Sequence, residues 1–97
     1  MTNPLKLQQL VKLLDLTRLT DDDQSDAMMQ WLAQQASAPI SPAALCVYPQ
    51  FLTQTSQFIR QQAWPAKLAT VVNFPSGDLA MELVVAEIGA ALSQGAD

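Results

Sequence analysis

The sequence contains no histidine and a single cysteine, Cys46. A disulfide bond within the chain is therefore impossible, and so is a catalytic Ser–His or Cys–His pair. A zinc site of the usual Cys/His type is not expected either, because its ligands are missing.

Positive charge is also scarce. The chain has 5 Lys and Arg against 9 Asp and Glu, which gives a formal net charge of −4. Without a cluster of Lys and Arg we expect no binding to nucleic acid or to an anionic membrane surface. No apolar run approaches the ~20 residues that span a bilayer, and the first ten residues lack the apolar core of a signal peptide. We expect a soluble, cytoplasmic chain.

What the chain does have is enough apolar sequence to fold. It contains 97 residues, of which 49% are hydrophobic and 14% charged, far from a disordered profile. This length bounds it to one domain at most.

Three short apolar segments are predicted to be strands: LLDLTRL (13–19), AALCVYP (43–49) and KLATVVNFP (67–75). The second and third are nearly continuous apolar runs, which are typical of parallel strands buried on both faces.

Each predicted strand is followed by a helical pattern. The first helix is expected after Thr20 as its cap, with Met28, Trp31 and Leu32 on one face. The second opens at Pro49, with an apolar face of Leu52, Thr55, Phe58 and Ile59. The third follows a turn at 76–78, ends at Gly95, and has an apolar face of Leu83, Val84, Ile88, Ala91 and Leu92. A short helix capped by Asn3 precedes the first strand.

The spacing of these segments indicates a repeated β-α unit and a parallel sheet. Two architectures repeat this unit: the doubly wound open sheet and the (β/α)₈ barrel. A barrel needs about 250 residues, so three units cannot close one. The chain ends at Asp97, where a further strand is expected and where the sheet edge would be open. We therefore expect the first third of a larger protein, or one partner of an assembly.

The carboxyl ends of parallel strands share one face, and functional side chains are expected there. We expect Asp15 and Thr17 toward the end of the first strand, and Cys46 and Tyr48 toward the end of the second. Asn73 and Phe74 would end the third. Burying Asp15 in an apolar run costs several kcal/mol, so it either pairs with a buried cation or takes part in proton chemistry. Cys46 is alternatively a small buried apolar residue.

At these residues the sequence resembles the 2-deoxyribose-5-phosphate aldolases. The matching motifs are LLDLTRLTDDD, AALCVYP, ATVVNFPSG and AEIGAALSQGAD, and they cover essentially the whole chain in order. The resemblance implies a (β/α)₈ barrel, with residues 1–97 as its leading helix and first three β-α units. It also implies a class I aldolase that uses a lysine Schiff base, with no metal and no cofactor. Such an enzyme reversibly cleaves 2-deoxy-D-ribose 5-phosphate to acetaldehyde and D-glyceraldehyde 3-phosphate.

The resemblance also implies roles for individual residues. Asp15 would be the pocket carboxylate in the proton-transfer network, and Thr17 and Leu19 would flank it. Cys46, Val71 and Phe74 would line the substrate pocket. The Schiff-base lysine and the phosphate site would come from later strands, so the isolated chain is predicted to be inactive.

Three hypotheses differ in what lies beside the third strand. The chain could be part of an aldolase whose remaining strands come from elsewhere, with a small phosphosugar as substrate. It could instead be a non-catalytic α/β fragment that forms homo-oligomers through its sheet edges. A flavodoxin-like binding domain is disfavoured, because the loops after the strands lack a glycine-rich phosphate cradle.

Overall fold

A computed structural model of the chain describes residues 4–20, 24–37 and 41–97. The elements, in chain order, are α1 (Pro4–Val11), β1 (Asp15–Arg18), α2 (Ser25–Ala36), β2 (Ala44–Val47), the 3₁₀ turn η1 (Pro49–Phe51), α3 (Leu52–Gln61), β3 (Lys67–Ala69) and α4 (Met81–Ser93). The predicted order, a leading helix and then three β-α units, is confirmed.

The strands form one parallel sheet in the order β1-β2-β3. Thr17 lies opposite Cys46, and Cys46 lies opposite Ala69. Each strand is shorter than predicted. Strand β3 ends at Ala69, so the expectation that Asn73 and Phe74 end the third strand is wrong, and both lie in the loop after it. Asp15 is the first residue of β1, so the expectation that it lies toward the strand's end is wrong.

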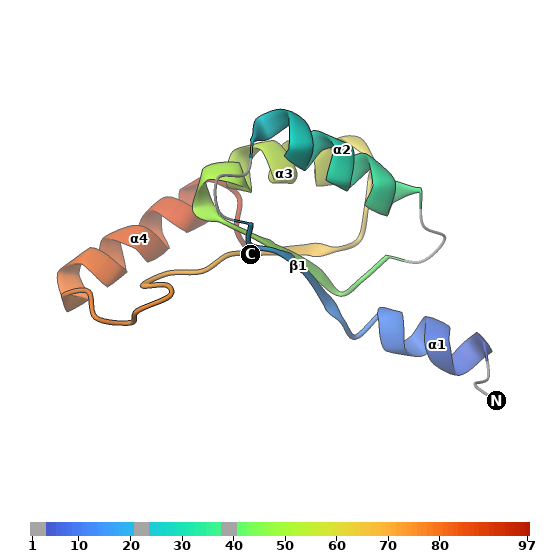
Figure 1. The fold of residues 1–97 in the computed structure, drawn as a ribbon, viewed down its shortest axis with the longest axis horizontal. Helices are drawn as coiled ribbons and strands as arrows, with labels where there is room; N and C mark the ends of the chain where they lie inside the picture. The colour runs from blue at the N-terminus through green and yellow to red at the C-terminus, as the bar shows by residue number, and fades with distance from the viewer. Residues whose placement is uncertain (1–3, 21–23, 38–40) are drawn as a thin grey trace.

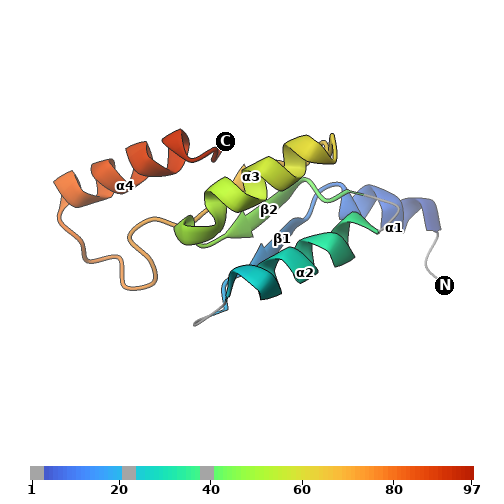
Figure 2. The ribbon, with the colours of Figure 1, turned by 90° about the horizontal axis from the view of Figure 1, so that it is seen from above.

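Helices α2 and α3 cover one face of this sheet (Figures 1 and 2). The strands alternate their side chains, which places Leu45, Val47 and Leu68 on the covered face. The buried helix side chains that meet them are Met28, Leu32, Leu52 and Phe58. The rings of Phe58 and Trp64 pack edge to face with centroids 6.2 Å apart. The helix faces predicted around Met28 and Leu52 are therefore confirmed.

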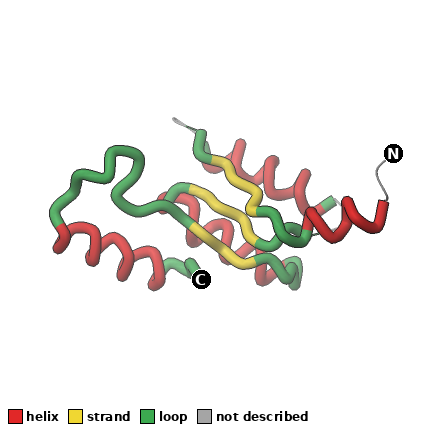
Figure 3. The backbone as a smooth tube through the Cα atoms, turned by 90° about the horizontal axis from the view of Figure 1, so that it is seen from below, coloured by secondary structure: helices red, strands yellow, loops and turns green. Residues whose placement is uncertain are grey.

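The opposite face of the sheet has no covering layer among the described residues (Figure 3). Asp15 and Thr17 are exposed and Cys46 is half-buried on this side. Burial on both faces was predicted for the second and third strands. On this side β2 is buried at Ala44 and half-buried at Cys46, whereas β3 has Lys67 exposed and Ala69 half-buried, so the prediction is wrong at Lys67. In a closed barrel this face would point inward, where side chains of other strands fill the space.

Helix α2 begins later than predicted. Its N-cap position is Gln24, which makes no side-chain capping hydrogen bond, so the prediction of Thr20 as the cap is wrong. Asn3 and the Asp21–Asp23 run lie outside the described residues.

Helix α4 leaves most of its apolar side chains in solvent. Ala91 is buried, but Leu83, Ile88 and Leu92 are 53%, 43% and 57% exposed. The predicted apolar face is therefore correct in spacing but largely uncovered. Figures 1 and 2 show α4 and α1 extending from opposite ends of the sheet, and the chain measures 48 × 27 × 23 Å.

The outer edge of β3 carries two hydrogen bonds from the end of the chain. The Asp97 N–H donates to the Leu68 carbonyl oxygen at 2.8 Å, and the Leu68 N–H donates to the Asp97 carboxylate at 2.8 Å. This edge was predicted to be open. At Leu68 its backbone N–H and carbonyl are hydrogen-bonded by one residue, Asp97, rather than by a further strand.

Among the described helices, none combines the length and the apolar character that crossing a membrane requires.

Candidate functional site

The uncovered sheet face carries the first group of candidate residues. Thr17, Cys46 and Ala69 form one row across the three strands. Asp15 and Lys67 lie in the preceding row, separated by Ala44 on β2. Because side chains two residues apart on a strand share a face, both rows point to the uncovered side.

Electrostatics link two of these residues. Burial raises the pKa of the Cys46 thiol, and the negative charge of Asp15 raises it further. The thiol is consequently protonated and weakly nucleophilic at neutral pH. Asp15 itself is exposed, so in this chain the expected cost of burying its carboxylate does not arise.

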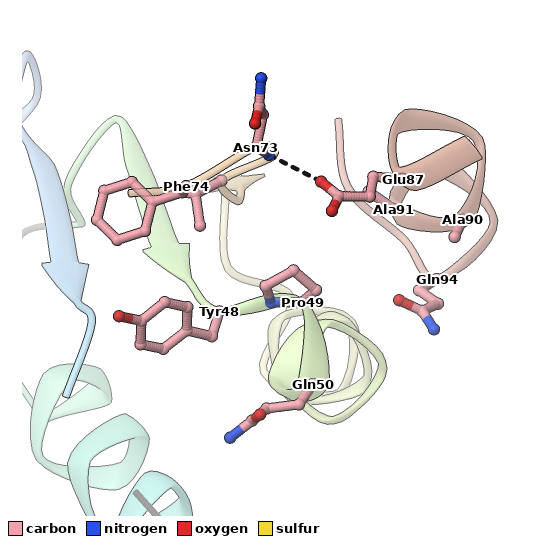
Figure 4. Close-up of a pocket in the computed structure, with 10 residues that line it drawn as sticks. Tyr48, Pro49, Gln50, Asn73, Phe74, Glu87, Ala90, Ala91 and Gln94 are labelled. Atoms are coloured by element: carbon pink, nitrogen blue, oxygen red, sulfur yellow. Dashed lines mark hydrogen bonds between the residues drawn. The ribbon is translucent and has the colours of Figure 1, made fainter. Parts of the chain in front are cut away.

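A second group surrounds a cavity of about 350 Å³ beyond the carboxyl ends of β2 and β3 (Figure 4). The cavity lies between η1, the loop after β3 and α4. Its lining residues are Tyr48, Pro49, Gln50, Val71, Asn73, Phe74, Glu87, Ala90, Ala91 and Gln94.

Asn73 organises the loop on one side of this cavity. Its carbonyl accepts a hydrogen bond from the Gly77 N–H at 2.9 Å, and its Oδ1 accepts one from the Leu79 N–H at 2.9 Å. Its own N–H donates to the Glu87 carboxylate at 2.8 Å. Its φ of 52° lies in the left-handed region, which asparagine tolerates better than most residues.

Aromatic side chains meet beside this loop. Phe74 packs edge to face on Tyr48, with ring centroids 6.1 Å apart. Tyr48 directly follows β2 and Phe74 lies in the loop after β3, so the contact joins the end of β2 to that loop. Figure 4 shows Phe74 above Tyr48 and the Glu87 carboxylate reaching Asn73 from the other side.

The predicted residues thus fall into two neighbouring places. Val71 and Phe74 line the cavity. Asp15, Thr17 and Cys46 lie on the uncovered sheet face and do not line that cavity, and Leu19 follows the end of β1. Their roles in a substrate pocket remain a prediction.

Glu87 is the residue at this site that the sequence interpretation missed. It lies within the apolar helix MELVVAEIGAALS, past the first turn where an acidic residue suits the helix dipole. A carboxylate in the middle of an otherwise apolar helix is the sequence signal that could have identified Glu87 as a candidate.

The side chains of this site are poorly suited to bind a metal ion. Among the described residues no group of three or more His, Cys, Asp or Glu side chains is arranged to hold one.

Together, the leading helix, the three parallel β-α units and the single uncovered sheet face define the first part of a TIM (β/α)₈ barrel. The solved structures that it matches include several deoxyribose-phosphate aldolases. No protein-family model matches the chain.

One of these structures, from Toxoplasma gondii, is assigned as a deoxyribose-phosphate aldolase. It matches with a TM-score of 0.80 and 23% identity over 96% of this chain and 35% of its own. A similarly assigned structure from Coccidioides immitis has a TM-score of 0.79 and 20% identity, over 92% of this chain and 34% of its own.

A third match is the tetrameric deoxyribose phosphate aldolase of Aeropyrum pernix, with a TM-score of 0.76 and 19% identity, over 92% of this chain and 36% of its own. At these identities the likeness establishes the fold. The chain spans about a third of the length of the structures that it matches.

Proposed function

We propose that residues 1–97 are the leading part of a class I deoxyribose-phosphate aldolase, a cytoplasmic lyase of deoxyribonucleotide catabolism. The observation that carries this proposal is the match to such aldolases over 92–96% of the chain. The motifs LLDLTRLTDDD, AALCVYP and ATVVNFPSG, which resemble the same family, support it independently.

In the proposed reaction a lysine amine condenses with acetaldehyde and releases water, and the resulting imine loses a proton to give an enamine. The enamine adds to D-glyceraldehyde 3-phosphate, and hydrolysis frees the product and the lysine. Asp15 would belong to the proton-transfer network of this sequence, flanked by Thr17 and Leu19. Cys46, Val71 and Phe74 would form the wall of the substrate pocket.

We propose that the Schiff-base lysine lies outside this chain. Lys6 is on α1, Lys12 follows α1, and Lys67 is the first residue of β3. None of the three follows the carboxyl end of a strand, where barrel enzymes hold their reacting groups. The isolated chain should therefore be inactive.

The partner in this proposal is the remainder of the barrel, which would pair with the outer edge of β3 and cover α4. A second candidate is a non-catalytic fragment that forms homo-oligomers. The exposed apolar side chains of α4 favour it, because contiguous exposed apolar surface marks an interaction site.

The test is borohydride trapping with acetaldehyde, read by intact mass. An active Schiff-base lysine gains one ethyl group after reduction. We expect this 10.5 kDa chain to stay unlabelled alone, and a larger chain that completes the barrel to be labelled when it is present.

Two other outcomes would decide against parts of the proposal. Labelling of one specific lysine in the chain alone would place the Schiff base here and contradict the predicted inactivity. Absence of label in every complex that the chain forms would favour the non-catalytic candidate.

A further inference from the structure

Helix α4 and the loop after β3 are joined by a polar contact that the proposed reaction does not use. The Glu87 carboxylate accepts a hydrogen bond from the Asn73 N–H at 2.8 Å. The buried residue of α4 is Ala91, and Val84 is half-buried.

Asn73 connects this contact to the whole loop. The same residue bonds Gly77 through its carbonyl and Leu79 through its side chain. A hydrogen bond that holds the Asn73 N–H therefore also restrains the part of the loop between Asn73 and the start of α4. The contact is exposed to solvent. A hydrogen bond to a carboxylate is nevertheless stronger than one between neutral groups, so Glu87 can hold the Asn73 N–H.

The anchored residue directly precedes Phe74. The left-handed backbone at Asn73, with φ 52°, sets the direction in which the chain leaves it. That direction brings Phe74 into its edge-to-face contact with Tyr48 at the end of β2. Loss of the anchor would let the loop rotate and would move Phe74 away from Tyr48.

We infer that Glu87 is a positioning residue: through the Asn73 N–H it holds Phe74 against Tyr48 and so shapes the cavity beyond β2 and β3. The effect on a bound substrate rests on the proposed function. The positioning itself does not, because the contacts lie wholly within this chain.

The test compares two changes of the same side chain. Glu87→Gln keeps an oxygen that can accept from Asn73, whereas Glu87→Ala removes it. Glu82→Ala is the matched control, since Glu82 is an exposed carboxylate in the first turn of the same helix. The readouts are hydrogen exchange at the Asn73 and Leu79 amides, the Asn73 amide proton shift, and the nuclear Overhauser contacts between the Tyr48 and Phe74 rings.

In Glu87→Ala we expect exchange at Asn73 to accelerate about tenfold, the low-field shift of its amide proton to be lost, and the ring contacts to weaken. Glu87→Gln should restore the ring contacts and stay within about threefold of the original exchange rate. Glu82→Ala should change none of these signals.

Unchanged Asn73 exchange and ring contacts in Glu87→Ala would overturn the inference. So would a loss of the core signals of Leu45 and Leu68 in both Glu87 variants, because it would assign Glu87 to general stability. Neither result depends on labelling by acetaldehyde, so the proposed function and this inference fail separately.

Discussion

At the scale of single residues, the strand or loop that carries each polar side chain decides which groups of the candidate site it can influence. Asp15 is exposed at the start of β1 and still acts on Cys46, which lies two residues further along the neighbouring strand. Asn73 adopts a left-handed backbone and makes three hydrogen bonds from one position. These roles depend on register and backbone conformation as well as on residue type.

Neutralising Asp15 should make Cys46 more reactive. The charge of Asp15 adds to the effect of burial in raising the thiol pKa, so Asp15→Asn should lower that pKa and increase the thiolate fraction. We expect labelling by a thiol reagent at about pH 8 to become about two- to threefold faster. Asp26→Asn, on exposed α2 surface, is the control. An unchanged rate in Asp15→Asn would show that burial alone controls the thiol.

The same thiol predicts how stability depends on pH. Folding raises the pKa of Cys46, so the folded state favours the protonated thiol. This contribution to the free energy of unfolding is complete below the unfolded pKa of about 8.5 and is lost as the pH rises through the higher folded value. Urea titrations from about pH 7 to 10 should show a smaller decline for Cys46→Ala than for the original chain.

At the scale of elements, α3 and α4 differ in how well they are covered. Helix α3 buries Leu52, Thr55 and Phe58 against the sheet, whereas α4 buries only Ala91. Gly95, two residues after α4, lies close against Ser56 of α3. Changes in α3 and at this approach should therefore affect stability more than changes on the outer side of α4.

Replacing Thr55 by valine should stabilise the chain. Thr55 is fully buried, and its Oγ1 finds no hydrogen-bond partner among the described residues. Removing an unsatisfied buried hydroxyl should raise the free energy of unfolding by about 1 kcal/mol. Thr53→Val, on the exposed side of the same helix, should change it by less than about 0.5 kcal/mol. Urea unfolding measures both, and a loss of stability in Thr55→Val would indicate a partner for the hydroxyl.

Replacing Gly95 by alanine should destabilise the chain. An added Cβ would lie 2.5 Å from Ser56 Oγ and 2.7 Å from Ser56 Cβ, and the φ of 110° disfavours any L side chain. We expect a loss of about 1–3 kcal/mol. Gly89→Ala is the matched control: its Cβ meets nothing within 4 Å, and alanine is the better helix former by about 1 kcal/mol. Equal melting temperatures for the two variants would contradict the prediction.

At the scale of the whole molecule, the described residues form a packed interface on one side of the sheet and leave other surfaces uncovered. The face of the sheet under α2 and α3 is packed. The opposite face, the outer edge of β3 and the apolar side of α4 are largely uncovered. Met81, Val85, Ile88 and Leu92 recur at helical spacing along that side of α4, and each is more than 40% exposed.

The exposed side of α4 predicts self-association when no other partner is present. We expect the chain to sediment above its monomer mass at tens of micromolar, because exposed apolar stripes drive association. Ile88→Glu should shift it toward monomer. Ala86→Glu adds the same charge at an exposed position on another side of the helix and should leave association unchanged. A monomer at all concentrations would remove the support for homo-oligomers.

The sequence by itself determined the order of elements, the parallel sheet and the buried faces of α2 and α3, because apolar periodicity reports which side of an element leaves water. The resemblance to the aldolases predicted Val71 and Phe74 as part of a pocket wall. Both line the cavity, and their contact with a substrate stays a prediction. The sequence could not decide that Asp15 begins β1, that α4 stays exposed, or that Glu87 anchors Asn73. These features depend on strand register, on which surfaces this chain can cover, and on contacts between residues 14 positions apart, and only the tertiary structure brings such partners together.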